Sequence, residues 1–201
     1  MKIVVVGATG TIGSEVVKAL SARHEVVSVS RSSRPAVDYT KPETITGLFA
    51  SVGAVDAVIS CAGGAVFKPL DQLTDADFER SLGDKLMGQV RLAVAALRNI
   101  KANGSITLTG GVMSHEPMPG GAAISLVNAA LEGFVRGAAI EAKNGVRVNL
   151  VSPPWITETL KKLGMTMDRH LSAAQVARAY VASVEGRQNG EIIDPALTSG
   201  S

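Results

Sequence analysis

The feature that most constrains this chain is a glycine-rich loop near its start, between an apolar run and an amphipathic helix. From Lys2 the sequence reads Lys-Ile-Val-Val-Val-Gly-Ala-Thr-Gly-Thr-Ile-Gly. Glycines three residues apart let the chain turn sharply, let a pyrophosphate approach the backbone, and let the helix pack closely on its strand. Free N–H groups and the positive end of the helix dipole attract an anion there. We therefore predict a dinucleotide site. Its loop residues are Gly7, Thr9, Gly10, Thr11 and Ile12.

The end of the second predicted strand indicates which dinucleotide is bound. NAD-binding chains usually place Asp or Glu there to bond the ribose 2′-hydroxyl, but this chain reads Ser30-Arg31-Ser32-Ser33-Arg34. A guanidinium flanked by hydroxyls suits a 2′-phosphate, and such a charge-assisted bond contributes roughly 1.5–3 kcal/mol. We expect NADP(H) to be preferred over NAD(H), through Ser30, Arg31 and Ser32. Arginines that are merely solvated loop charges are the alternative.

Composition narrows the class of protein. A chain of 201 residues, 46% hydrophobic, can bury one sizeable core, so residues 1–201 are expected to form a single dinucleotide-binding domain. A formal charge of +2 and few aromatic residues argue against a nucleic-acid surface. The single cysteine, Cys61, excludes an internal disulfide, and no leader precedes the first strand, so we expect a cytoplasmic protein. No apolar stretch approaches membrane-spanning length, and we expect no membrane association and no metal site.

Strands and helices alternate along the rest of the chain. Short apolar strands are predicted at 55–60, 105–109, 147–151 and 191–194, with helices at 74–99, 122–143 and 173–185. Thr74 with Asp77 and Ser172 with Gln175 have the spacing of capping boxes. This order predicts an α/β fold, a Rossmann-like doubly wound parallel sheet in three α/β/α layers. Its ligand crevice lies beyond the carboxyl ends of the strands.

One connection is too short for this pattern. Between Arg31 and a predicted third strand at 36–39 there are too few residues for a helical crossover, so we expect a shortened connection after the second strand. Asp38 follows that predicted strand. It is a candidate acceptor for the adenine amino group, with a turn-forming role as the alternative.

These motifs together resemble the short-chain dehydrogenase/reductase family over nearly the whole chain. Besides the glycine loop, the matching segments are Ser60-Cys61-Ala62-Gly63, Val127-Asn128-Ala129-Ala130-Leu131, Gly145-Val146-Arg147-Val148-Asn149 through Pro153, and Asn189-Gly190-Glu191-Ile192. The resemblance implies a Rossmann-like fold, a nicotinamide cofactor, a small-molecule substrate, and usually a homodimer or homotetramer built from the two long helices. It also implies that the cofactor site includes Cys61, Ala62, Gly63, Thr109, Asn128, Pro153, Ile156 and Thr157.

The chain departs from the family at all four reacting positions. The resemblance aligns Ile124 with the family's Tyr, Asn128 with its Lys, and Gly111 with its Ser, while Lys85 stands near its helix Asn. The family's Tyr hydroxyl passes a proton to the carbonyl oxygen, which contributes about a hundred- to ten-thousandfold. Ile124 has no proton to give, so the chain is expected to be an atypical member with a non-standard proton donor.

Candidate donors follow the predicted strand at 105–109. His115 suits proton transfer near neutral pH, with Ser114 as a neighbouring hydroxyl and Glu116 as an orienting carboxylate. An exposed loop histidine is the alternative. Lys85 is a second candidate if its side chain points inward. Tyr39 and Tyr180 are expected to be packing residues.

The segment after Pro153 is expected to form a short lid. Trp155, Leu163, Met165 and Met167 offer an apolar wall, and Thr157 or Thr159 a bond to the pyrophosphate. The chain is therefore expected to be an NADP(H)-dependent oxidoreductase acting on a small apolar carbonyl or alcohol, or a quinone-like compound. A catalytically silent NADP(H)-binding regulator or sensor is the alternative.

Overall fold

The computed structural model describes residues 1–198. A six-stranded parallel sheet lies at its centre. Its strand order is β2-β1-β3-β4-β5-β8, and every pairing is parallel. The strands are β1 (Lys2–Val6), β2 (Glu25–Val29), β3 (Val55–Ser60), β4 (Ile100–Thr109), β5 (Arg147–Val151) and β8 (Ile192–Ile193). Near-continuous apolar runs such as Ile3–Val6 suit strands that are covered on both faces.

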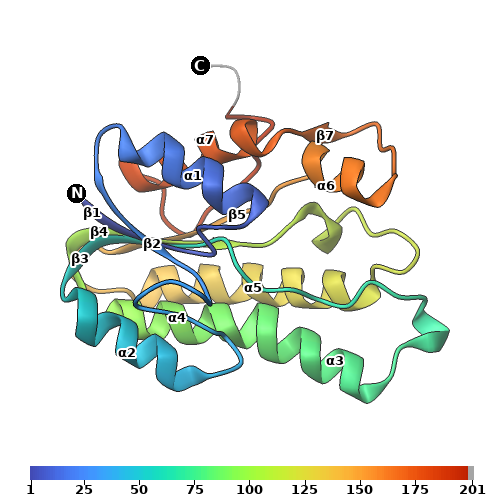
Figure 1. The fold of residues 1–201 in the computed structure, drawn as a ribbon, viewed down its shortest axis with the longest axis horizontal. Coiled ribbons are helices and arrows are strands. Elements are labelled where there is room, and N and C mark those ends of the chain that lie inside the picture. Colours follow the sequence, from blue (N-terminus) through green and yellow to red (C-terminus); the bar gives the residue numbers. More distant parts are fainter. Residues whose placement is uncertain (199–201) are drawn as a thin grey trace.

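Helices cover both faces of the sheet, which gives the predicted three layers (Figure 1). On one face lie α1 (Thr11–Ser21) and α7 (Ala173–Glu185), packed around Leu20 and Tyr180. On the other face lie α2 (Pro42–Val52), α4 (Met87–Leu97) and α5 (Ala122–Glu141). The Rossmann-like fold predicted from the alternating pattern is confirmed.

The helix predicted at 74–99 is interrupted by a wider turn. It begins as α3 (Asp75–Ser81), passes through a π-helical segment, η2 (Leu82–Leu86), and continues as α4. Both predicted capping boxes form, Thr74 with Asp77 and Ser172 with Gln175. π-Helical turns inside α-helices are frequent at functional sites, and this one carries Lys85.

The strand predicted at 36–39 is wrong. The structure has only an isolated bridge between Ser30 and Ala36, and the chain then enters α2, a helix that the sequence analysis did not predict. Pro42 stands at the start of α2, where its missing N–H costs nothing, and Ile45, Leu48 and Phe49 form its buried face. The crossover from β2 to β3 therefore does contain a helix. It begins at Pro42, after the segment that was expected to be a strand.

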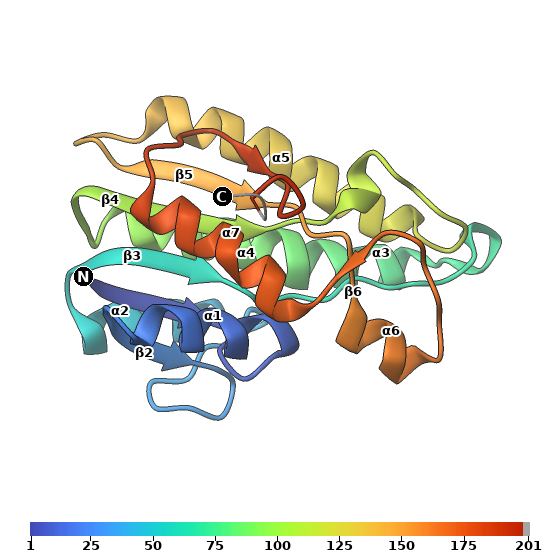
Figure 2. The same ribbon diagram turned by 90° about the horizontal axis from the view of Figure 1, so that it is seen from above.

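The remaining short elements gather at the carboxyl ends of the strands (Figure 2). They are η1 (Leu70–Gln72), η3 (Val112–Ser114), the two-stranded sheet of β6 (Trp155–Ile156) and β7 (His170–Leu171), and α6 (Thr157–Leu163) between those two strands. This is the side of an open parallel sheet where ligands bind.

By length and composition α5 could cross a membrane, which corrects the expectation that no apolar stretch approaches that length. In this structure α5 packs on the sheet. Leu131 and Val135 are buried against Val148 and Leu150 of β5. An apolar helix of this kind is also typical of a protein core, and its contacts here are core contacts.

Candidate active site

The glycine loop fits a close-packed anion site. Gly7 has a φ of +85°, and a Cβ there would lie 2.7 Å from the carbonyl carbon of Cys61. A Cβ at Gly13 would lie 2.0 Å from the carbonyl oxygen of Gly7. The N-cap of α1 is Gly10, which gives no side-chain bond, and the first turn holds no acidic residue. The first turn of α1 therefore holds no carboxylate of its own that would compete with a phosphate for these N–H groups.

Two cavities meet at the carboxyl end of β3. The Arg31 cavity, of about 420 Å³, lies beside the glycine loop, and the Lys85 cavity, of about 280 Å³, lies beside the ends of β4 and β5. Cys61, Ala62 and Gly63 line both. The two cavities thus form one trough along the edge of the sheet where a dinucleotide is expected.

The Arg31 cavity gathers most of the predicted residues of the adenosine half. Gly7, Thr9, Gly10, Ser30, Arg31 and Asp38 line it, together with Tyr39, Arg80 and Asp84. Thr11 and Ser32 do not line it. The Ser32 N–H instead bonds the Ser30 hydroxyl at 3.2 Å, which closes the turn that follows β2.

Asp38 forms a turn and also lines the Arg31 cavity. Its Oδ1 accepts bonds from the Thr40 hydroxyl at 2.7 Å and the Thr40 N–H at 3.0 Å. These two bonds lower the pKa of the Asp38 carboxyl. Asp38 can therefore form the turn through Oδ1 and still offer Oδ2 as an acceptor for the adenine amino group, because Oδ2 takes no part in the turn.

The Lys85 cavity is largely apolar. Its apolar wall comes from α1, α5, the loops after β3 and β4, and the segment after β5 that forms the lid. The apolar residues are Ile12, Ala62, Val112, Met113, Ile124, Pro153, Pro154, Trp155 and Ile156. Lys85, Thr109, Asn128 and Thr159 are its polar lining. Trp155 also makes an edge-to-face contact with Phe67, at 6.5 Å between ring centroids. The cavity suits a ligand that is mostly apolar with one polar group.

Two polar side chains are fixed on one wall of this cavity. Lys85 Nζ donates to the carbonyl oxygen of Gly110 at 3.1 Å, and Asn128 Nδ2 donates to that of Gly111 at 3.0 Å. Asn128 Oδ1 is buried and has no hydrogen-bond partner in residues 1–198. A buried acceptor without a partner is costly, and a ribose hydroxyl of a bound dinucleotide would satisfy it.

Burial in this cavity lowers the pKa of Lys85 to about 8, against a smaller opposing effect of the Asp84 carboxylate. Asp84 itself accepts a bond from the Gly64 N–H at 3.1 Å. Gly63 packs on Lys85, since a Cβ there would lie 2.9 Å from the Lys85 Cα. The hydrogen bond from Nζ to Gly110 holds the ammonium inward, which is the condition for Lys85 to be a candidate donor.

Gln89 is a residue that sequence reasoning missed. It is fully buried, and its amide bonds both the N–H and the carbonyl oxygen of Thr109, each at 2.9 Å, and the Lys85 carbonyl oxygen at 3.1 Å. It thereby joins the end of β4 to the helix that carries Lys85. The signal was present, since a glutamine four residues after a lysine places two polar groups on one side of a helix.

The four positions aligned with the family's reacting residues come together. Lys85, Gly111, Ile124 and Asn128 all line the Lys85 cavity. Residues from three separate parts of the chain, which the resemblance aligned with the family's reacting residues, thus lie around one cavity. The side chain at the position aligned with the family's Tyr is the apolar Ile124, and no tyrosine lines this cavity.

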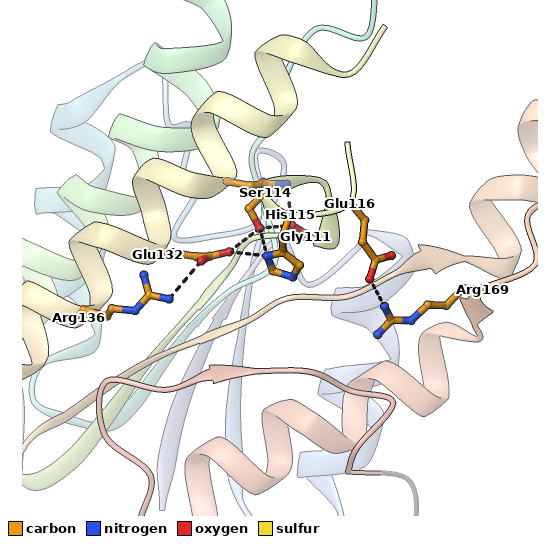
Figure 3. Close-up of polar contacts among 8 residues, drawn as sticks. Gly111, Ser114, His115, Glu116, Glu132, Arg136 and Arg169 are labelled. Carbon is orange, nitrogen blue, oxygen red and sulfur yellow. Dashed lines mark hydrogen bonds and ion pairs between the residues drawn. The ribbon is translucent and has the colours of Figure 1, made fainter. Parts of the chain in front are cut away.

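His115 does not join this site. It lines a separate cavity of about 220 Å³, with Glu132, Arg136 and Asp194. Ser114 donates to Glu132 Oε1 at 2.5 Å and lies 2.9 Å from His115 Nδ1, so the predicted neighbours do meet (Figure 3). The orienting carboxylate is Glu132, whereas Glu116 pairs with Arg169.

The two tyrosines are packing residues, as expected. Tyr39 and Tyr180 are buried, and they bond Ser60 Oγ at 2.7 Å and Thr109 Oγ1 at 2.6 Å. Thr109 Oγ1 also donates to the carbonyl oxygen of Ser60. Burial raises the pKa of the Cys61 thiol to about 12, which agrees with a packing role rather than a nucleophilic one.

The lid brings one of its two threonines to the cavity. Thr159 lines it, while the Thr157 hydroxyl lies 2.9 Å from His170 Nδ1 and faces the other strand of the small sheet. Pro153 and Ile156 line the cavity as predicted. Of the expected apolar wall, only Trp155 lines the cavity. Leu163 is exposed, and Met165 and Met167 do not line it.

Comparison with known proteins identifies the family. A family model described as enoyl-(acyl carrier protein) reductase matches residues 2–190. The chain belongs to the short-chain dehydrogenase/reductase family, whose members use a nicotinamide cofactor.

Relatives of known sequence and structure agree with this assignment. The chain is similar to the hydroxynaphthalene reductase of Aspergillus fumigatus, at 28% identity over 91% of this chain and 66% of that protein. A hydroxynaphthalene reductase-like protein of Metarhizium guizhouense is 31% identical over 62% of this chain and 49% of its own length. The chain thus spans between about half and two thirds of these curated relatives.

Among solved structures, the protein lin1944 of Listeria innocua has a TM-score of 0.93 and 38% identity, covering 96% of this chain and 98% of that one. A small-chain dehydrogenase solved in complex with NADPH has a TM-score of 0.84 and 26% identity, covering 100% and 99%.

Proposed function

We propose that this protein is an NADP(H)-dependent oxidoreductase that acts on a small apolar carbonyl compound or its alcohol, or on a quinone-like compound. The observation that carries the proposal is the pair of adjoining cavities, one beside Arg31 and the glycine loop, the other apolar with Lys85 and Asn128 on one wall. A bound nicotinamide would supply the hydride. Family membership supports the chemistry, and a similar dehydrogenase was solved with NADPH.

The chain offers groups for each part of the cofactor. The loop from Gly7 to Ile12 and the start of α1 would hold the pyrophosphate, with Thr159 of the lid. Arg31 and Ser30 would hold the 2′-phosphate, and Asp38 the adenine. Asn128 Oδ1 would accept from the nicotinamide ribose.

The wall around Trp155 and Met113 favours a planar aromatic substrate. Aromatic rings pack edge to face or offset on such side chains, and the T-shaped pair of Trp155 with Phe67 shows one such arrangement already. The hydroxynaphthalene reductases among the relatives support the same class. We propose fused-ring aromatic ketones and quinones as the first substrates to test.

The test has two parts. Calorimetry with NADPH and NADH should give tighter binding of NADPH. A panel of aromatic aldehydes, ketones and quinones, followed at the NADPH absorbance, should then give turnover for at least one aromatic member. Turnover only with charged sugars or acyl-carrier substrates would contradict the proposed substrate class.

Ile124 favours the second candidate, a catalytically silent NADP(H)-binding regulator or sensor. Its apolar side chain lines the cavity where the family's tyrosine is aligned. Tight NADPH binding without turnover on the whole panel would support this function over the first.

We also propose that residues 1–201 act as one dinucleotide-binding domain, in the cytoplasm, and as a homodimer or homotetramer. The outer face of α5 exposes Leu126 and Ile140, at 46% and 87% of their surface, which suits pairing with a second copy. Light scattering after size-exclusion chromatography measures the oligomeric state, and a monomer at all concentrations would contradict this proposal.

A further inference from the structure

We propose that Lys85 binds the substrate's carbonyl oxygen in the Lys85 cavity and gives that oxygen its proton when the carbonyl is reduced. This inference rests on the proposed function and adds the residue that replaces the missing hydroxyl.

The position of Lys85 carries the argument. Its Nζ has three N–H donors, and one bonds the Gly110 carbonyl oxygen at 3.1 Å. Within residues 1–198 the ammonium has no ion pair and no second hydrogen-bond acceptor. A cation that lines an apolar cavity with donors to spare favours a ligand oxygen that is negative or becomes negative.

Other groups around the cavity do not compete as acids. Cys61 is the only other titratable residue that lines it, and burial holds the pKa of that thiol at about 12. The Thr109 hydroxyl is already shared between Ser60 and Tyr180. His115 and Glu132 line a different cavity.

The charged groups nearest to Lys85 belong to its own helix and to the adjoining cavity. Asp84 precedes it and raises its pKa, while burial lowers that pKa more strongly, to about 8. Arg80 lines the Arg31 cavity with Asp84. The polar or titratable side chains that line the cavity from β4, the loop after β3 and α5 are Thr109, Cys61 and Asn128, and none of them is charged. An amine with this pKa is protonated at neutral pH and can release the proton readily.

The chemistry balances with one coenzyme and one proton. The carbonyl carbon gains a hydride from the reduced nicotinamide, the π pair of the C=O bond moves to the oxygen, and the new O–H bond takes the proton of a Lys85 N–H bond. The products are the alcohol, NADP⁺ and a neutral amine, which takes a proton back from water.

The first test uses turnover in the wild type and in three variants. Lys85→Met removes the amine and should lower the rate constant of the chemical step by about a hundred- to ten-thousandfold. Lys85→Arg keeps the charge and the donors, but its much higher pKa makes it a poor acid, so the loss should also be large. Lys101→Met, at an exposed lysine paired with Asp56, is the matched control and should keep the wild-type rate.

The pH profile separates proton donation from mere positioning. The rate of reduction by the wild type should fall as the pH rises through the pKa of Lys85, since only the ammonium can donate. Lys85→Arg should show no fall in that range. An unchanged profile in Lys85→Arg or Lys85→Met would overturn the inference.

A binding measurement tests the oxygen site without turnover. Trp155 is the only tryptophan in the chain and lines the cavity, so its fluorescence reports binding there. 4-Nitrophenol added below its own pKa should quench Trp155 and show the absorbance of its phenolate in the wild type and in Lys85→Arg. In Lys85→Met it should bind at least about tenfold more weakly, the usual size for losing a charge-assisted bond.

The outcomes distinguish the two proposals. Turnover or phenolate binding that Lys85→Met retains would overturn the role of Lys85, and so would a loss in His115→Ala as large as that in Lys85→Met. Absence of NADPH binding to the wild type by calorimetry would overturn the proposed function instead. NADPH binding without turnover on any substrate would refute proton donation, whatever the phenolate result.

Discussion

Lys85 and Asn128 come from different helical segments, yet they donate hydrogen bonds to the carbonyl oxygens of two consecutive residues, Gly110 and Gly111. The short loop after β4 therefore fixes these two polar groups relative to each other. Gln89 bonds Thr109, the last residue of β4, directly before this loop. Two backbone carbonyls thus hold Lys85 and Asn128 in place. These side chains are already positioned before a cofactor or substrate binds.

Arg31→Ala should weaken NADPH binding by about ten- to a hundredfold, the usual size of one charge-assisted bond, while NADH binding changes little. Titration calorimetry with both dinucleotides measures the difference. Arg34→Ala is the control, because Arg34 lies in the same loop and does not line the Arg31 cavity. Equal losses for the two dinucleotides in Arg31→Ala would contradict recognition of the 2′-phosphate.

Gly13→Ala should abolish dinucleotide binding and destabilise the fold, because its Cβ would overlap the Gly7 carbonyl. Gly47→Ala is the matched control in α2, where a Cβ would meet nothing within 4 Å. It should raise the free energy of unfolding by roughly 0.5–1 kcal/mol, since alanine is the better helix former. Urea denaturation measures both variants. A Gly13→Ala protein as stable as the wild type would show that the loop can relax.

Gln89→Leu should lower the free energy of unfolding by about 1–3 kcal/mol, because the N–H and carbonyl of Thr109 would lose a buried partner. Gln72→Leu, at an exposed glutamine of η1, should stay within about 0.5 kcal/mol of the wild type. Urea denaturation compares the two. If Gln89→Leu behaves like the control, the clamp between β4 and α4 does not contribute to stability.

The stability of the wild type relative to Lys85→Met should rise with pH between about 8 and 10.5, the pKa values of Lys85 in the folded chain and of an ordinary lysine. In that window the unfolded chain holds a proton that the folded chain has lost, so higher pH favours folding. Below it both states are protonated and the difference is constant. Thermal melting of both proteins across this range gives the measurement, and parallel curves would mean that the folded pKa of Lys85 is not lowered.

Much of the fold could be predicted from the sequence because its signals are local. The apolar run at Ile3–Val6 and the two capping boxes each depend on a few adjacent residues, and the structure has them where they were predicted. Helix α2 was missed because residues 36–39 were interpreted as a strand. The spacing of Ile45, Leu48 and Phe49 is helical and would have corrected that interpretation.

The site was harder to predict, because side-chain direction depends on tertiary packing. His115 follows β4, whose carboxyl end borders the Lys85 cavity, so the sequence suggested that His115 faces that cavity. In the structure it comes directly after the turn at Val112–Ser114 and lines a separate cavity with Glu132. Lys85 depends on a π-helical turn that no propensity indicates. Asn128 and Ile124 were located by alignment with a family, and periodicity alone would have marked them only as helix residues.

The π-helical turn at Leu82–Leu86 makes the length of this region as important as its residues. Each residue of an α-helix turns the chain by about 100°, so deleting one residue here would rotate everything upstream by that angle relative to α4. The capped start at Thr74 and the loop with Phe67, whose ring contacts Trp155 of the cavity wall, would rotate together. A one-residue deletion would thus change which side chains border the cavity without replacing any of them.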